Sequence, residues 1–123
     1  MRFKNEPLSH EPPPPRHEGL YSGNWRGFYA QIGRTFPQQQ RMEFADGIVR
    51  GEGADGIGTF VIEGEYRAEG ANEVRIGWVK TYTNAHSVLY LGVFDGARIR
   101  GKWEIGRLGD RFEFAPEQRN STT

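Results

Sequence analysis

The chain has 123 residues, with 16 basic and 16 acidic side chains, 17 glycines and no cysteine. The zero formal net charge argues against a general nucleic-acid binder and against docking to an anionic membrane surface, because both need a surplus of basic residues. The lack of cysteine excludes disulfides, thiolate metal sites and a cysteine nucleophile, so core packing has to hold the fold.

The first part of the chain is dominated by proline. The run Pro12-Pro13-Pro14-Pro15 cannot form a helix interior or a central strand. We therefore predict a flexible tail over residues 1–18, which is either a solvated spacer or a polyproline ligand for a partner's aromatic groove. No apolar run has the length of a signal peptide core or a membrane helix, so we expect a cytoplasmic protein.

Short alternating segments separated by turn residues fill residues 19–116, and residues 117–123 form a C-terminal tail. In chain order we expect strands at 25–31, 40–44, 48–53, 59–66, 74–82, 86–94, 98–105 and 111–114. Asp-Gly turns between them favour hairpins, so neighbours in the sequence should pair antiparallel. Eight such strands can close on themselves, and we predict an all-β, eight-stranded antiparallel up-and-down barrel.

Side chains alternate along a strand, and this alternation predicts the interior of the barrel. In the segment 98–105, Ile99, Gly101 and Trp103 alternate with charged residues, so they should face inward. Glycines recur at inward positions in several strands. They either let the strands bend around bulky neighbours or leave a cavity for a ligand.

One strand is apolar on both faces. Leu89, Leu91 and Val93 alternate with an equally apolar set on the opposite face, and a strand of this kind is buried on both sides. In a single-layer barrel only another chain or the tail can cover the outer face. We therefore predict a homo-oligomer or a protein partner on an outer wall formed by Phe28, Val61, Val79, Leu89, Leu91 and Val93.

The most suggestive polar group is Lys80, Tyr82, His86 and Tyr90. If these side chains face inward, they gather at one mouth of the barrel, where a cation over aromatic walls can orient a polar or anionic ligand. The predicted ligand lining is Tyr29, Tyr66, Trp78, Lys80, Tyr82, His86, Tyr90 and Trp103. The alternative is that Lys80 extends to solvent and His86 is an exposed turn residue.

We find little sign of catalysis, of a metal site or of a cofactor. His10 and His17 lie in the tail, which leaves His86 without a second ordered histidine for a metal ion. The segment Gly51–Gly56 matches a dinucleotide fingerprint literally, but a strand follows it where the fingerprint needs a helix. We assign no catalytic residue and favour a non-enzymatic protein, with a barrel isomerase or cyclase as a minor alternative.

The element Gly23-Asn24-Trp25, followed by eight sequential antiparallel strands, resembles the calycin barrels, which include lipocalins, fatty-acid-binding proteins and avidins. The resemblance covers residues 19–116 as a topology, and the short hairpins look more similar to avidins. It implies a ligand cup at one end, oligomers formed through barrel walls, and a tryptophan packed against a basic residue of the last strand, here Arg111. Biotin contacts have no counterpart in this sequence, so biotin binding is not implied.

Two functions follow as hypotheses. In the first, the barrel binds a small apolar or mixed-polarity molecule at one mouth. In the second, it is an interaction or assembly module that uses the outer apolar wall, with the proline-rich tail as a tether.

Overall fold

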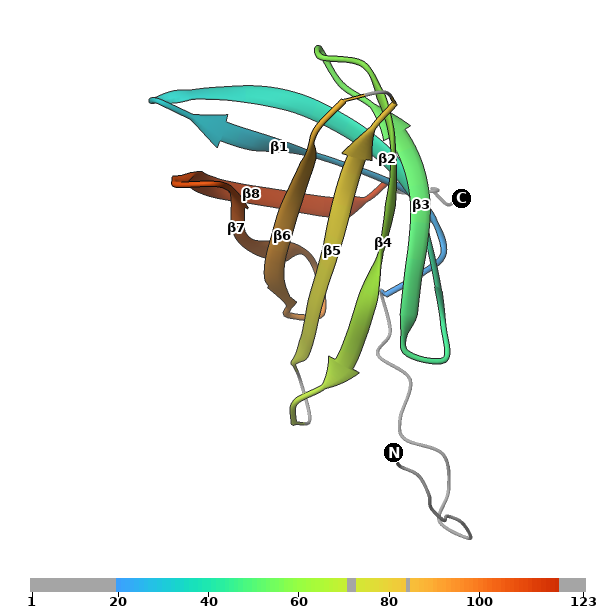
Figure 1. Cartoon of the computed structure of the whole chain (residues 1–123). Helices are drawn as coiled ribbons and strands as arrows, with labels where there is room; N and C mark the ends of the chain where they lie inside the picture. Colours follow the sequence, from blue (N-terminus) through green and yellow to red (C-terminus); the bar gives the residue numbers. More distant parts are fainter. Residues whose placement is uncertain (1–19, 71–72, 84, 118–123) are drawn as a thin grey trace, which may run out of the picture.

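A computed structural model of the chain describes residues 20–70, 73–83 and 85–117. Eight strands form one closed barrel in sequence order, and every neighbouring pair is antiparallel (Figure 1). The strands are β1 (Gly23–Gln31), β2 (Arg34–Ala45), β3 (Ile48–Ala54), β4 (Thr59–Ala68), β5 (Val74–Tyr82), β6 (Ser87–Phe94), β7 (Ile99–Ile105) and β8 (Leu108–Pro116). The predicted fold class is confirmed.

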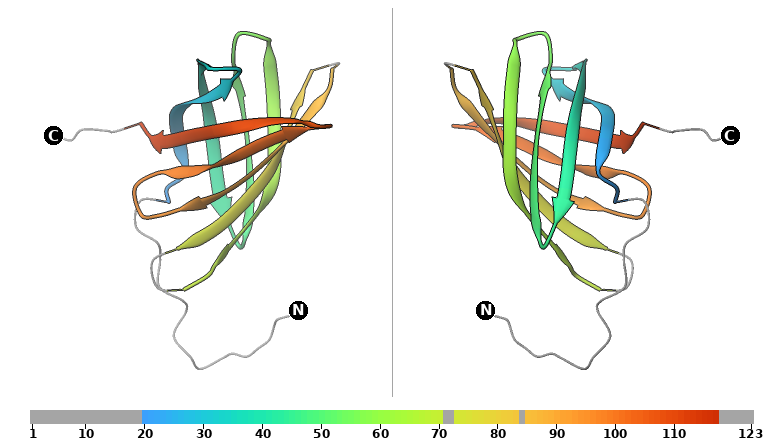
Figure 2. Two further views of the ribbon diagram at one scale, coloured as in Figure 1. Left: turned by 90° about the vertical axis from the view of Figure 1, so that its left-hand side faces the viewer. Right: turned by 90° about the vertical axis from the view of Figure 1, so that its right-hand side faces the viewer.

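Pairing between the first and last strands closes the barrel. Trp25 to Tyr29 of β1 pair antiparallel with Pro116 to Phe112 of β8, and these strands lie next to each other in Figure 1. Figure 2 shows the same closed barrel from two further sides. The predicted tail at residues 1–18 lies outside the described residues. In the part of the chain that the structure describes, no helix has the length and apolar character needed to cross a membrane.

The second strand is longer than predicted. β2 begins at Arg34 and includes Pro37, which pairs with Phe28 of β1. The sequence predicted a strand only over residues 40–44. A proline within a strand cannot donate a ladder hydrogen bond. The pairing of β2 with β3 begins only at Gln39, so β2 is an edge strand at Pro37, and there a missing N–H is tolerated.

Two hairpin turns have both central residues in the left-handed region. These are Asp46-Gly47, with φ of 53° and 81°, and Ile32-Gly33, with φ of 48° and 76°. This turn matches the right-handed twist of the flanking strands and favours Asn-Gly or Asp-Gly. The sequence predicted the first turn through its Asp-Gly pair. It gave no signal for the second, because isoleucine is a β-branched residue that rarely adopts positive φ.

Replacing Ile32 with asparagine should stabilise the protein. Ile32 is 86% exposed, so the substitution removes no core contact and relieves a left-handed backbone that costs about 1 kcal/mol for a branched residue. Urea unfolding should therefore give a free energy of unfolding that is higher by about 1 kcal/mol. An unchanged or lower value would show that the turn carries no strain.

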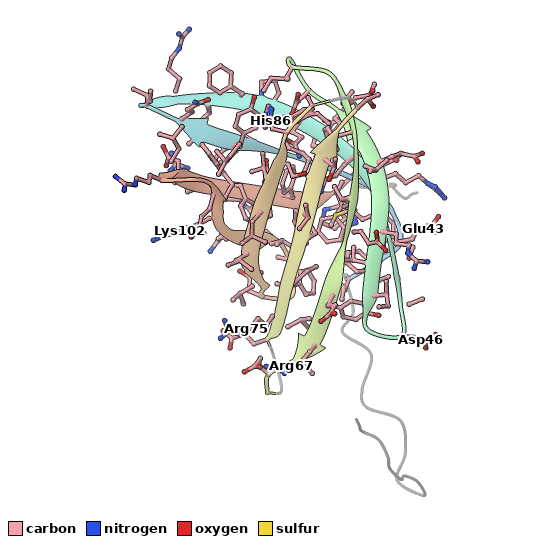
Figure 3. All side chains as sticks on the ribbon, viewed as in Figure 1. Glu43, Asp46, Arg67, Arg75, His86 and Lys102 are labelled. Carbon is pink, nitrogen blue, oxygen red and sulfur yellow. The ribbon has the colours of Figure 1, made fainter. Side chains whose placement is uncertain are left out.

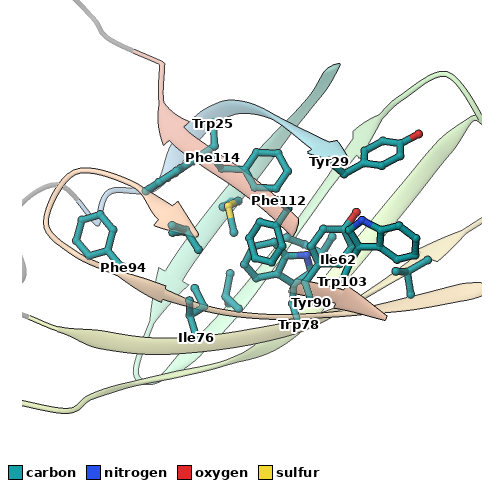
Figure 4. Packing of buried hydrophobic residues seen from close by; sticks show 14 of the residues in the cluster. Trp25, Tyr29, Ile62, Ile76, Trp78, Tyr90, Phe94, Trp103, Phe112 and Phe114 are labelled. Atoms are coloured by element: carbon teal, nitrogen blue, oxygen red, sulfur yellow. The ribbon is translucent and has the colours of Figure 1, made fainter. Parts of the chain in front are cut away.

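Aromatic side chains fill the interior. Trp78, Tyr90 and Phe112 pack together in the middle of the barrel, with ring centroids 4.8–5.5 Å apart (Figure 4). Glycines on the inward face bring neighbouring backbones close. A Cβ added at Gly64 would lie 1.9 Å from the Gly77 carbonyl oxygen. The missing side chains of these glycines therefore allow the strands to bend and their backbones to approach each other closely.

Trp25 closes the end of the barrel where the β2–β3 turn lies. It is fully buried against Phe44 and Phe94, and its Nε1 donates to the Tyr21 carbonyl oxygen at 2.9 Å. The expected basic partner from the last strand is wrong. The Arg111 guanidinium lies 5.2 Å from the ring of Phe28, because inward residues of β8 alternate with outward ones and Arg111 is outward.

Candidate functional site

A lysine is buried near the opposite end of the barrel. Lys80 lies on β5 with its side chain pointing inward, and the residue is only 1% exposed. Its Nζ donates to Gln38 Oε1 and to Asp55 Oδ2, both at 2.9 Å. The Asp55 side chain has no solvent exposure. An ion pair therefore lies inside the barrel. Removing both charges from water costs free energy that their mutual attraction often does not recover, so stabilising the fold is by itself a weak reason for this pair to be there.

Four aromatic rings surround the lysine ammonium. Lys80 Nζ lies 5.0 Å from the ring centroid of Tyr29, 4.8 Å from that of Phe60, 4.8 Å from that of Tyr82 and 5.2 Å from that of Tyr90. Ring faces attract cations at this range, and the attraction is stronger where water is excluded. The rings partly offset the loss of hydration on this side chain.

Asp55 comes from the turn between β3 and β4. Its Oδ1 accepts the backbone N–H groups of Ile57 at 2.8 Å and Gly58 at 3.3 Å, which is the usual role of aspartate in a turn. Its Oδ2 accepts the Tyr82 hydroxyl at 2.6 Å as well as Lys80 Nζ. One carboxylate oxygen therefore shapes the turn, and the other reaches into the barrel.

The turn between β6 and β7 offers an internal comparison. Asp95 Oδ1 accepts the N–H groups of Ala97 at 2.9 Å and Arg98 at 3.0 Å, as Asp55 does in its own turn. Asp95 is nevertheless exposed, and its Oδ2 lies 3.7 Å from Arg100 at the surface. The turn thus forms without a buried ion pair, so the inward contacts of Asp55 are a separate feature.

The surroundings shift the pKa values of this cluster. Burial lowers the pKa of Lys80, and the neighbouring Asp55 only partly opposes this effect. Burial acts to raise the pKa of Asp55, but hydrogen bonds from Tyr82, Lys80 and Ile57 outweigh it and leave that pKa below its ordinary value. Burial first, and Asp55 second, raise the pKa of Tyr29, Tyr82 and Tyr90.

The structure brings together most of the predicted ligand lining. Tyr29, Tyr82 and Tyr90 surround Lys80, and Trp78 stacks on Tyr90 at 5.3 Å. Trp103 is buried and donates through Nε1 to the Ala30 carbonyl oxygen.

Two predicted members lie elsewhere. Tyr66 packs on Phe44 in the other half of the barrel, at a centroid distance of 5.5 Å. His86 is exposed and lies between β5 and β6, near Tyr82, as the alternative to the ligand site predicted (Figure 3). The alternative that Lys80 extends to solvent is wrong, because the side chain is buried.

Two polar members of the cluster were missed from the sequence. Gln38 is 2% exposed and lies on the part of β2 that precedes the predicted strand at residues 40–44. Counting backward by twos from the buried Met42 would have placed Gln40 and Gln38 inward, had Pro37 been accepted within a strand. Asp55 was assigned to a turn, which is correct, but no local pattern pointed to its second oxygen.

The outer face of β5 and β6 forms an apolar wall. We use "outer wall" for the outward residues Val79, Leu89, Leu91 and Val93 together with Gly77. Val79 is 41% exposed and Leu91 is 49% exposed, and a shallow hollow of about 910 Å³ lies over this face. A Cβ added at Gly77 would meet Leu91 Cδ2 at 2.9 Å, so the leucine lies across the strand beside the glycine.

Charged residues of β4 and β7 flank the outer wall in three rows set by the strand register. The acidic row is Glu63, Val79, Leu89 and Glu104; the middle row is Glu65, Gly77, Leu91 and Lys102; the basic row is Arg67, Arg75, Val93 and Arg100. Glu69 pairs with Arg67 and Arg75, Asp95 and Glu113 lie near Arg100, and Arg50 lies 3.6 Å from Glu63, so surface ion pairs reduce the charge of both the basic and the acidic row. Figure 3 labels Arg67 and Arg75 at the lower end of this face.

Two residues assigned to the wall do not lie on it. Phe28 is on β1, which pairs with β2 and β8 and not with the strands of the wall. Val61 is on β4 and is 57% exposed, but it lines a separate surface hollow with Glu52 and Arg41. The sequence could not separate these positions, because alternation tells outside from inside but not which strands meet around a barrel.

Among residues 20–70, 73–83 and 85–117, no group of three histidine, cysteine or acidic side chains is placed to hold a metal ion. Comparisons with protein families, with curated proteins and with solved structures find no match for this chain.

Proposed function

We propose that this protein is a non-enzymatic assembly module that pairs with a second copy of itself through the outer wall. The observation that carries the proposal is the order of the three rows, in which an apolar centre lies between an acidic and a basic end. The filled interior favours this function over a ligand cup that is open in the free protein. The avidin branch of the calycin barrels, which the topology resembles, also assembles through barrel walls.

The order of charge selects one orientation of the second copy. A two-fold axis that lies in the plane of the wall and runs across the strands places the acidic row of one copy over the basic row of the other. Glu104 then faces the second copy's Arg100, and Glu63 faces the second copy's Arg67. This axis also brings Glu65 and Lys102 of the middle row each against its own counterpart. An axis parallel to the strands would instead pair Glu65 with Lys102, but it would place like charges opposite each other in both the acidic and the basic row, which is the less favourable balance.

The centre of the pairing is Leu91. This residue lies in the middle row, so the two-fold axis brings it against its own counterpart beside Gly77. Four strands spaced by about 4.8 Å give a contact only about 14 Å wide, so we expect a weak dimer whose population depends on concentration.

Replacing Leu91 with lysine should abolish the pairing. An ammonium group at the centre of the apolar contact should weaken dimerisation about 100-fold. Sedimentation equilibrium over a wide concentration range measures this. The matched control is Ile32→Lys in the turn between β1 and β2, where the isoleucine is 86% exposed and two strands separate this hairpin from β5 and β6 on either side. A wild-type chain that remains monomeric throughout, or a Leu91→Lys dimer as tight as the wild type, would overturn the proposal.

Charge reversal tests the orientation. Glu104→Arg and Arg100→Glu should each weaken the dimer, because each places like charges opposite each other. The double variant should regain most of the wild-type affinity, since both reversed pairs attract again. A dimer that persists in Ile32→Lys, is lost in Leu91→Lys and is unchanged by both charge reversals would support the wall but contradict the antiparallel arrangement.

A further inference from the structure

We propose that the buried Lys80 cluster is a binding site for a small carboxylic acid, whose carboxylate takes the place that Asp55 Oδ2 occupies on Lys80 and Tyr82. The site lies inside the barrel, so it is independent of the outer wall and of the pairing proposed there.

The first support is that the occupant of the site is displaceable. Oδ1 of Asp55 is sufficient for the turn, as the exposed Asp95 turn demonstrates. The loop around Asp55 packs against little: Ile57 is 60% exposed, and a Cβ added at Gly56 or Gly58 would have no heavy atom within 4 Å. Moving this turn outward therefore breaks few contacts other than those of Asp55 itself.

The second support is the set of donors that would be left behind. With the turn displaced, Lys80 Nζ and the Tyr82 hydroxyl lose the oxygen that they share at 2.9 and 2.6 Å. In the same cluster, Trp78 Nε1 is buried without a hydrogen-bond partner among the described residues. Trp78 stacks on Tyr90, whose ring is 5.2 Å from Lys80 Nζ. Buried donors without a partner are rare in native structures, and this donor lies on the ring that stacks against Tyr90 of the cluster.

The third support concerns the class of ligand. Lys80 is the only buried basic residue among those that the structure describes, so the site can compensate one negative charge. A carboxylate fits this balance, whereas a phosphate dianion would bury a second charge without a partner. The rings of Tyr29, Phe60 and Tyr90 would receive the apolar part of the acid. A planar aryl group suits such walls best.

The test uses the full chain and two acids as probes. Asp55→Ala removes the internal carboxylate, and we expect sodium acetate and sodium benzoate to raise the Tm of this variant by several degrees at constant ionic strength. Acetamide and benzamide, which are similar in shape but uncharged, should have no effect. The rise in Tm caused by the two acids should disappear in the double variant Asp55→Ala/Lys80→Met.

The wild type provides the decisive measurement. Benzoate titrated into isotopically labelled wild-type protein should shift the backbone amides of Gly56 and Ile57 and the indole N–H of Trp78. Its Kd should be at least about 10-fold weaker than for Asp55→Ala, because Asp55 competes for the same place. If Asp55→Ala does not fold, this titration still tests the site.

Three results would overturn the proposal. The first is a folded Asp55→Ala protein that ignores both acids. The second is a response that persists without Lys80. The third is rescue of the variant with no binding to the wild type, which would make the ion pair a structural element only. None of these depends on whether the protein dimerises, since Leu91→Lys should bind benzoate as the wild type does.

Discussion

Asp55→Asn should lower the free energy of unfolding by about 3–5 kcal/mol, the usual result of removing one partner from a buried ion pair. Asparagine keeps the oxygen that accepts the Ile57 and Gly58 N–H groups, so the turn itself can persist. The inward position, however, loses its charge and leaves Lys80 buried without a carboxylate. The loss should therefore come from the lysine and not from the turn.

The matched control is Asp95→Asn. This substitution makes the same chemical change in the same kind of turn, but on an exposed side chain whose partner is a surface arginine. We expect it to change the free energy of unfolding by less than about 1 kcal/mol. The double variant Asp55→Asn/Lys80→Met should recover most of the stability lost in Asp55→Asn, because no buried charge remains.

The deficit of Asp55→Asn should shrink as the pH rises. Burial lowers the pKa of Lys80 below its ordinary value of 10.5, and Asp55 acts against this shift. Without Asp55 the folded-state pKa falls further. A lowered lysine pKa means that the unfolded chain binds more protons, so stability increases with pH between the folded and unfolded pKa values.

Urea titrations from about pH 7 to about pH 9.5, below the ordinary pKa of tyrosine, measure this trend. A deficit that stays constant over this range, or a loss equal to that of Asp95→Asn, would show that Lys80 does not depend on Asp55.

Acid should act on the wild type through the same carboxylate. The pKa of Asp55 in the folded protein lies below its ordinary value of 3.8. The stability that Asp55 contributes is therefore fully present above that ordinary value, and it is lost as the pH falls through the folded-state pKa. The part of the acid sensitivity that disappears in Asp55→Asn reports this contribution.

Gly101→Ala should also destabilise the barrel strongly, with an expected loss of about 3 kcal/mol in the free energy of unfolding. A Cβ at this position would lie 1.9 Å from the Leu91 carbonyl oxygen and 2.5 Å from the Gly92 Cα. Both obstacles are backbone atoms of the neighbouring strand β6, so no side chain can rotate away. The strands have to separate, which weakens their ladder and disturbs the aromatic packing beneath.

Gly56→Ala is the control for this prediction. An added Cβ there meets no heavy atom within 4 Å, so the change should stay within about 0.5 kcal/mol. Urea unfolding of both variants gives the comparison. A loss below about 1 kcal/mol for Gly101→Ala would mean that β6 and β7 can shift at little cost, and that the close approach does not fix the curvature of the barrel.

Local pattern alone was sufficient to derive the barrel. Two-residue alternation marked the strands, and Asp-Gly pairs marked the turns at Asp46 and Asp95. Short connections left sequential antiparallel pairing as the natural topology. These features are decided within a few residues along the chain, so a single sequence reveals them. The predicted start of β2 at residue 40 was wrong. Pro37 is compatible with a strand only where one neighbouring strand is missing, and the sequence does not show how far along β2 the pairing with β3 extends.

The contents of the barrel were decided by tertiary structure. Alternation places Lys80 inside, but it does not name the residues that it meets. Asp55 lies 25 residues away and Gln38 lies 42 residues away. Contacts across a barrel depend on the stagger of all eight strands, and this stagger is fixed only when the sheet closes. The same closure sets Phe28 apart from Leu91, although both read as outward apolar residues. The sequence therefore determined which side of the sheet each residue faces, and the closed sheet determined which residues share a site.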